Sequence, residues 1–231
     1  MSTFHTYRFS FHQVAPSEGD VLDFLQSSDL DKEHPAVVFT HQILHEISSN
    51  DITGGYILKD NEPVDVKQGE IRVEDTILKV GSQIASYLKE ATRTAFFLCT
   101  AGEYFTKKTT ELNDSGDIME AFILDAVGSL TVENAMNQIQ ESLSEALKPE
   151  NLKISNRYSP GYCNWHLSDQ KHLFDLIGQN PTGVNINSSC LMTPRKSVSG
   201  VIGIGEHVKR REYGCKICRN VDCIYRKIIK Q

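Results

Sequence analysis

The stretch that decides the fold is GDIMEAFILDAVGSLTVENAMNQIQESLSEALK, residues 116–148. Its apolar residues recur at spacings of three and four from Met119 to Leu143. That period is typical of an amphipathic helix with one buried face. The pattern predicts one long helix, or two helices joined near Gly128. A helix of this length and apolar content is expected to form the spine of the core.

Both helices and strands are predicted on either side of this stretch. Apolar residues at helical spacing predict further helices at 35–47, 74–91 and 168–177, the last with Ser168 as its N-cap. Alternation and short apolar runs predict strands at 7–11, 56–59, 95–102, 184–192 and 197–205. Because these elements do not alternate in a regular βαβ order, we expect an α+β fold. The expected architecture is a single domain whose twisted, largely antiparallel sheet packs against long helices.

The composition is that of an ordinary soluble globular protein. Apolar residues make up 39% of the 231 residues and charged residues 23%. No run approaches 18 consecutive apolar residues, and the N-terminus lacks a basic patch followed by an apolar run. We therefore expect a cytoplasmic protein without a membrane span. Its six cysteines are then expected to be thiols or metal ligands rather than disulfides.

The charge is distributed unevenly along the chain. Residues 195–231 contain ten Lys/Arg and three Asp/Glu, whereas residues 1–194 contain fourteen and twenty-seven. We interpret 1–205 as the folded domain and 206–231 as a basic, cysteine-containing tail. A basic tail on an acidic body suggests an anionic partner, although a solvated tail that aids solubility explains it equally well. The acidic net charge of −6 argues against general nucleic-acid binding.

A second unusual stretch is RYSPGYCNW, residues 157–165. Arg157 offers a planar fork that pairs with a carboxylate, and the turn at Pro160-Gly161 exposes backbone groups. Tyr158, Tyr162 and Trp165 offer aromatic faces for a flat base or a cation. These groups together suit a ligand with a carboxylate, a cation and an adenine, such as S-adenosylmethionine. The alternative is a turn whose aromatic rings pack on the core and whose arginine is a surface residue.

The order of several motifs resembles one known family. RYSPGY (157–162), SSCLMTP (188–194) and KSVSG (196–200) resemble the reactivation domain of cobalamin-dependent methionine synthase. TAGEYF (100–105) and MEAFILDAVGSLTVE (119–133) resemble the free-standing form of that domain. The resemblance implies S-adenosylmethionine binding and reductive remethylation of cob(II)alamin. The cobalamin would be carried by a partner methionine synthase or a related corrinoid protein, and a flavodoxin or a similar protein would donate the electron.

The resemblance also implies which residues bind the ligand. Arg157 and Tyr162 match the arginine and the tyrosine of the family loop, Gly161 lies in the same turn, and Asn164 falls where the family uses backbone groups. The family also places an acidic residue near the ligand, and the implied candidates on the long helix are Glu133 and Asp125.

The chain departs from the family pattern in three places. Tyr158 and Cys163 stand where the family loop has prolines, and VIGIGEHVKRREYGCKICRNVDC (201–223) replaces an aromatic-rich strand that contributes to the ligand site.

The tail contains Cys215, Cys218 and Cys223 in a C-x2-C-x4-C pattern. Thiolates two residues apart are a common chelate for zinc or an iron–sulfur cluster, although redox-active or plain reduced cysteines fit the pattern as well. A fourth ligand would have to come from elsewhere, and the candidates are Cys163, Cys190 and His207. The surrounding Lys and Arg residues suit docking of an acidic flavodoxin or ferredoxin-like electron donor.

Three hypotheses follow for the function. The first is a reactivation module that binds S-adenosylmethionine and acts with a corrinoid partner. The second is a metal- or iron–sulfur-binding electron-relay or interaction protein on the same fold, without S-adenosylmethionine binding. The third is an independent corrinoid methyltransferase that uses another methyl donor.

Overall fold

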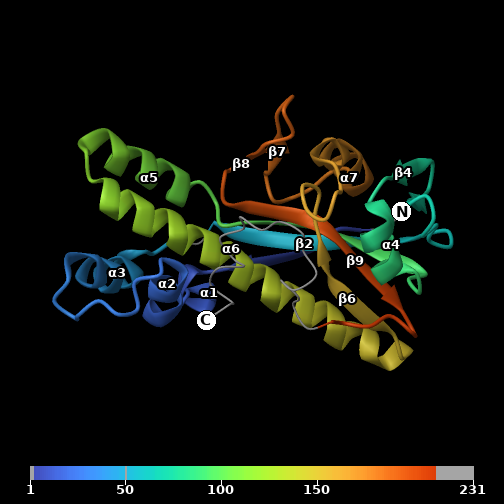
Figure 1. Cartoon of the computed structure of the whole chain (residues 1–231), viewed down its shortest axis with the longest axis horizontal. Helices are drawn as coiled ribbons and strands as arrows, with labels where there is room; N and C mark the ends of the chain where they lie inside the picture. Colours follow the sequence, from blue (N-terminus) through green and yellow to red (C-terminus); the bar gives the residue numbers. More distant parts are fainter. Residues whose placement is uncertain (1–2, 50, 212–231) are drawn as a thin grey trace.

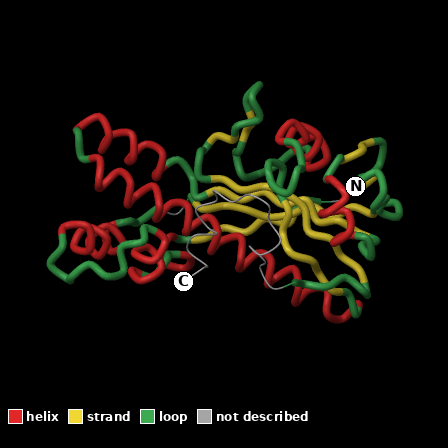
Figure 2. The backbone as a smooth tube through the Cα atoms, in the orientation of Figure 1, coloured by secondary structure: helices red, strands yellow, loops and turns green. Residues whose placement is uncertain are grey.

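The structure is a computed structural model that describes residues 3–49 and 51–211. Its helices and strands alternate without a regular repeat (Figures 1 and 2). In chain order the elements are β1 (His5–Phe9), α1 (Phe11–Val14), α2 (Glu18–Phe24), α3 (Pro35–Glu46), β2 (Ile52–Asp60), β3 (Ile71–Val73), β4 (Thr76–Leu78), α4 (Gly81–Leu88), β5 (Arg93–Thr100), α5 (Tyr104–Ser115), α6 (Ile118–Leu147), η1 (Lys148–Glu150), β6 (Lys153–Tyr158), η2 (Leu167–Asp169), α7 (Gln170–Ile177), β7 (Asn185–Ile186), β8 (Met192–Thr193) and β9 (Ser197–Gly205).

The centre of the molecule is a five-stranded sheet with the order β1-β2-β5-β9-β6. All four neighbouring pairs are antiparallel. β5 and β9 are buried over most of their length, because each has a strand on both sides and packed elements on both faces. β6 lies at one edge and is bulged between Ile154 and Arg157. The predicted α+β class with a largely antiparallel sheet is confirmed.

The long helix is α6, which is continuous for 30 residues, about 45 Å at the usual rise per residue. It crosses one face of the sheet (Figure 1), and its buried residues recur along one side from Ala121 to Leu147. Gly128 does not interrupt it. A Cβ at Gly128 would lie 2.8 Å from the Phe105 ring, so the glycine lets α5 pack closely against α6. The alternative of two helices joined near Gly128 is therefore wrong.

Two apolar cores lie on the two faces of the sheet. The core under α6 includes Cys99, Ile139 and Ile202, together with residues of α1, α3 and α5. The core on the opposite face is covered by α4, α7 and the β3–β4 hairpin, and it includes Trp165 and Val201. Alternation along the central strands accounts for both cores, because successive side chains point to opposite faces. None of the helices in the described ranges has the length and apolar content needed to span a bilayer.

Several predicted boundaries are wrong for local reasons. Phe11 begins α1 instead of continuing the first strand, because its backbone N–H bonds to Ser49 and not to β2. The helix predicted over 74–91 is only Gly81–Leu88, since Glu74 has a φ of 52° and turns the chain between β3 and β4.

Two further predictions from the sequence need correction, and one helix was missed. The strand predicted at 184–192 is a hairpin turn between β7 and β8, and the Asn187 side chain accepts two backbone hydrogen bonds within it. Ser168 lies inside η2 and does not cap α7. α5, which packs along α6, was not predicted at all.

Candidate functional site

Arg157 lies near the end of edge strand β6 and faces α6. In the sheet register it is opposite Ile202, a residue of the core under α6. Its Nη2 donates a hydrogen bond to Glu133 Oε2 at 2.9 Å, and its side chain is only 11% exposed. Its Nη1 is buried and has no hydrogen-bond partner among the residues that the structure describes. Leaving a buried donor unsatisfied costs about 1–3 kcal/mol. An acceptor supplied at Nη1 would recover that energy.

The Arg157–Glu133 pair belongs to a polar stripe along α6. Asp125, Ser129 and Glu133 follow one another at intervals of four, so they share one side of the helix. Lys196, the residue immediately before β9, contacts Asp125 Oδ1 at 2.7 Å and Ser129 Oγ at 2.9 Å. Glu133 and Asp125, the two candidate acids, are thus each paired with a largely buried basic side chain. Only Glu133 is beside Arg157, because Asp125 lies two turns away, about 12 Å along the helix.

Cys99 lies close enough to this pair for both charges to act on its thiol. The thiol is fully buried on β5. Its pKa is raised to about 12, mainly by burial and also by the Glu133 carboxylate, while the Arg157 guanidinium acts in the opposite direction. The thiol is therefore protonated at neutral pH. Because the thiolate is the nucleophile and the metal ligand, Cys99 serves as a packing residue here.

The loop after β6 forms the predicted tight turn. Gly161 has a φ of 94°, and the backbone N–H of Tyr162 donates to Ser159 O at 3.3 Å, which fits a type II turn. Cys163 and Asn164 also have positive φ values, 50° and 67°. Tyr162 is 62% exposed. The loop therefore presents a phenol ring and a strained backbone to its surroundings.

Trp165 and Tyr158 do not offer free aromatic faces as the sequence suggested. Trp165 is 1% exposed and packs in the core on the face away from α6. Its indole N–H donates to Asp169 Oδ2 at 3.0 Å, and the same oxygen accepts from the Lys79 backbone N–H. Tyr158 stacks on Tyr87 with 5.9 Å between ring centroids. For these two rings, the alternative of aromatics that pack on the core is right.

The predicted residues fall into two groups at β6. Arg157 and Glu133 meet on the α6 face. The loop packs toward elements of the other face: a Cβ on Gly161 would lie 3.8 Å from Leu167, and the Asn164 carbonyl lies about 4 Å from where a Cβ on Gly81 would be. A ligand that contacts both groups must therefore wrap around the end of β6.

Gly200 and Lys196 contact the elements that carry the predicted residues, β6 and α6, and the sequence pointed to neither of them. A Cβ on Gly200 would lie 2.2 Å from the Tyr158 carbonyl oxygen, so the glycine lets the end of β6 lie close against β9. The signal available in the sequence was the SVSG motif, although the motif alone does not show which strand it contacts. No pattern in the sequence indicated a role for Lys196, because the residues that it contacts lie 67 and 71 positions earlier in the chain.

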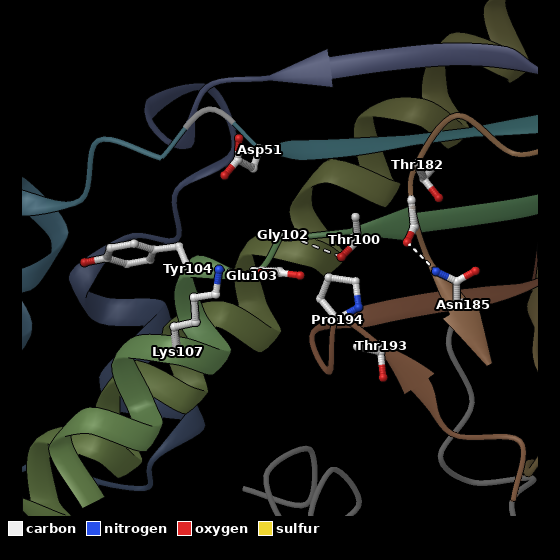
Figure 3. Close-up of a pocket in the computed structure, with 11 residues that line it drawn as sticks. Asp51, Thr100, Gly102, Glu103, Tyr104, Lys107, Thr182, Asn185, Thr193 and Pro194 are labelled. Atoms are coloured by element: carbon white, nitrogen blue, oxygen red, sulfur yellow. Dashed lines mark hydrogen bonds and ion pairs between the residues drawn. The ribbon is translucent and has the colours of Figure 1, made fainter. Parts of the chain in front are cut away.

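An open pocket of about 480 Å³ lies near the start of β9 (Figure 3). One wall comes from the start of α5 and the other from the segment around β7 and β8. The lining residues are Asp51, Thr100, Gly102, Glu103, Tyr104, Lys107, Thr182, Gly183, Asn185, Thr193 and Pro194. Glu103 forms an ion pair with Lys107, and hydrogen bonding to Glu103 raises the pKa of Lys107. None of the predicted site residues lines this pocket.

A basic pocket of about 530 Å³ lies where β6, α6 and the segment after β9 meet. Its lining includes the basic side chains of Lys148, Lys153, His207, Lys209 and Arg210. Lys148 pairs with Glu145 and Arg210 with Glu141. Lys153 and Lys209 have no ion pair with any described residue. The pocket therefore carries a surplus of positive charge.

The predicted metal ligands Cys215, Cys218 and Cys223 lie outside the described residues. Within the described ranges, no group of three or more His, Cys, Asp or Glu side chains could hold a metal ion. The three candidates for a fourth ligand lie in different places. Cys163 is in the loop after β6, Cys190 is buried in the turn between β7 and β8, and His207 lines the basic pocket.

Comparison with known proteins gives a match to one family and matches among solved structures. A family model described as "Vitamin B12 dependent methionine synthase, activation domain" matches residues 40–223. Among solved structures, 13 chains match. One is the MetH reactivation domain bound to AdoHcy, with a TM-score of 0.63 and 14% sequence identity, covering 91% of this chain and 80% of that one. The match to this solved structure shows similarity of fold. No curated protein matches the chain.

Proposed function

The chain belongs to the activation-domain family of vitamin B12-dependent methionine synthase, and on that basis we propose that it binds S-adenosylmethionine beside Arg157. In this proposal it supports the reductive remethylation of cob(II)alamin carried by a partner methionine synthase or a related corrinoid protein. The solved relative with AdoHcy bound supports the choice of ligand, because AdoHcy is S-adenosylmethionine without its methyl group.

The proposal depends on how the two terminal nitrogens of the Arg157 guanidinium are hydrogen-bonded. Glu133 holds Nη2 and orients the planar fork, while Nη1 is buried and lacks an acceptor among the described residues. A ligand carboxylate would accept from Nη1 in a charge-assisted hydrogen bond. Because Nη1 is buried, the carboxylate reaches it only after neighbouring atoms move aside. The methionyl carboxylate of S-adenosylmethionine is the group that we assign to this position.

The loop after β6 would hold the rest of the ligand. Tyr162 is exposed and offers its ring, while the positive φ values at Gly161 and Asn164 turn the backbone so that its polar groups can face a ligand. When bound, S-adenosylmethionine supplies a methyl group on a positively charged sulfur for transfer to the partner's cobalamin. The contribution of this chain is orientation, since holding two reactants in register removes much of the entropic barrier.

The basic pocket beside β6 supports the proposed electron donor. Lys153 and Lys209 lie there without acidic partners among the described residues, and residues 195–231 carry a surplus of seven positive charges. An acidic flavodoxin or ferredoxin-like protein would be attracted to such a surface, and attraction of this kind raises association rates. We assign this face to the electron donor.

Calorimetry with S-adenosylmethionine tests the binding site. Arg157→Lys keeps the charge and removes the planar fork, so binding should weaken by about 10- to 150-fold, which corresponds to the loss of one charge-assisted hydrogen bond. Arg195→Lys is the matched control, because Arg195 is exposed, and its affinity should equal that of the wild type. Absence of wild-type binding in the presence of a corrinoid partner, or equal affinity in Arg157→Lys, contradicts the proposal.

Transfer of a labelled methyl group tests the role in reactivation. The chain, S-adenosylmethionine, a reductant and the oxidised corrinoid protein should together yield labelled corrinoid protein. Omitting this chain should abolish the label. Transfer to free cobalamin without any partner protein would instead indicate an independent methyltransferase.

A further inference from the structure

Edge strand β6 departs from the regular alternation of a strand just before Arg157. Ile154 pairs with Ile204 and belongs to the core under α6. Arg157 pairs with Ile202 and contacts Glu133 of α6. In a regular strand, side chains three positions apart lie on opposite faces. Ile154 and Arg157 nevertheless face the same helix, so the alternation is reversed between them.

A bulge at Ser155 and Asn156 causes this reversal. Three positions of β6 separate Ile154 from Arg157, whereas only two positions of β9 separate the residues paired with them. One residue of β6 is thus extra, which is what defines a β-bulge. Tyr158 shows the same reversal, because it packs on the side away from α6 although it lies four positions after Ile154. Without the bulge Arg157 would face away from α6, since a shift of one residue moves each following side chain to the other face.

Ser155 holds the bulge from inside the protein. It is fully buried, and its hydroxyl accepts a hydrogen bond from the Gly203 backbone N–H at 2.9 Å and donates to the Asn156 carbonyl at 2.7 Å. The hydroxyl thus takes the place of a backbone acceptor between β9 and β6. Gln140 of α6, also buried, donates from Nε2 to the Ser155 carbonyl at 3.2 Å. Because a buried donor without an acceptor is costly, Gly203 and Gln140 both favour the bulged conformation.

Asn156 holds the bulge from the edge of the sheet. The backbone N–H of Arg211 donates to Asn156 Oδ1 at 2.7 Å, and Asn156 Nδ2 donates to the Arg211 carbonyl at 2.9 Å. One side chain is thus bonded to both polar backbone groups of residue 211. The Arg211 guanidinium in turn lies over the Tyr87 ring of α4 at 4.7 Å. Asn156 is therefore held against a segment that is itself fixed to the fold.

We propose that Ser155 and Asn156 are positioning residues for Arg157, because they hold the bulge that turns its guanidinium toward Glu133. Neither side chain needs to contact the ligand in this role. The inference rests on the proposed function, in which Arg157 binds S-adenosylmethionine. The position of Arg157 can also be measured in protein without ligand, so the two proposals can fail separately.

Nuclear Overhauser effects in the ligand-free protein test the position of Arg157. Wild type should show contacts between the side-chain protons of Arg157 and Glu133. Ser155→Ala should make the bulged and the regular strand comparably populated, and so reduce these contacts by about half or more. Thr40→Val is the matched control, because it also removes a buried, hydrogen-bonded hydroxyl, on α3 at the other end of the molecule (Figure 1). The control should keep the contacts, and unchanged contacts in both Ser155→Ala and Asn156→Ala overturn the proposal.

Calorimetry with S-adenosylmethionine tests whether the two residues act through Arg157. Ser155→Ala should weaken binding about 3- to 30-fold when Arg157 is present, and less than about twofold in the Arg157→Lys background. A general loss of stability would weaken binding equally in both backgrounds, and that result overturns the proposal. Asn156→Ala changes a side chain that is only partly buried, so it provides the same test if Ser155→Ala fails to fold.

The two measurements separate this inference from the proposed function. Loss of the Arg157–Glu133 contacts in Ser155→Ala, together with no binding of S-adenosylmethionine by the wild type, would contradict the proposed function and support the role of the bulge. Wild-type binding that both Ser155→Ala and Asn156→Ala leave unchanged would support the proposed function and contradict the role of the bulge.

Discussion

Adding a single methyl group at Gly200 should destabilise the contact between β6 and β9 on which the site depends. A Cβ at this position would lie 2.2 Å from the Tyr158 carbonyl oxygen and 2.8 Å from both Phe97 Cζ and Ser159 Oγ. The aromatic ring and the hydroxyl could shift, but the carbonyl belongs to the backbone of β6. Gly200→Ala can therefore be accommodated only if the end of β6 moves away from β9.

The cost of Gly200→Ala can be estimated from these contacts. Overpacking a well-packed core costs about 1–3 kcal/mol, and an obstruction by backbone puts this position at the upper end, about 3 kcal/mol. For a chain of this size, 1 kcal/mol lowers Tm by about 2–4 °C, so Gly200→Ala should melt about 6–12 °C lower. Binding of S-adenosylmethionine should weaken as well, since Arg157 precedes Tyr158 on the displaced strand.

Urea unfolding followed by tryptophan fluorescence provides the assay. Trp165 is the single tryptophan of the chain and is buried, so its emission reports loss of the core. Gly19→Ala is the matched control, because the nearest atom to its Cβ would be Ser17 Oγ at 3.8 Å. Gly19 lies in α2, so the control should be stabilised by about 0.4–1 kcal/mol. A Gly200→Ala stability within about 0.5 kcal/mol of wild type would refute this reasoning.

Two further predictions concern buried side chains. Trp165→Phe removes the indole N–H that donates to Asp169, so it should lower the free energy of unfolding by about 1–3 kcal/mol. Urea unfolding followed by circular dichroism measures this change. An unchanged unfolding midpoint would contradict the prediction. Burial raises the pKa of Cys99 from about 9 to about 12, so the unfolded chain releases this proton first as pH rises. Stability should therefore fall between about pH 9 and 12, by up to about 1.4 kcal/mol per pH unit more in wild type than in Cys99→Ala. Equal slopes would show that the thiol does not titrate in this way.

Local patterns in the sequence accounted well for the long helix and for the central strands. The spacing of apolar residues in 116–148 depends only on neighbours within a few turns, and α6 forms there without a break. The predicted strands 95–102 and 197–205 agree closely with β5 and β9. The tight turn at Pro160-Gly161 was also predictable, because Gly161 needs its positive φ. The region of β7 and β8 was misassigned because each strand is only two residues long, and α5 was missed because its sequence is largely polar.

The sequence by itself thus determined an α+β domain with one long helix and a tight turn rich in functional groups. Only the tertiary structure decided that Glu133 and not Asp125 holds Arg157, that Trp165 lies in the core, and that Asn156 anchors Arg211. The physical reason is how far apart in the sequence the interacting residues lie. Helix periodicity and turn geometry arise from residues a few positions apart, whereas an ion pair across 24 positions exists only after the sheet has brought β6 against α6.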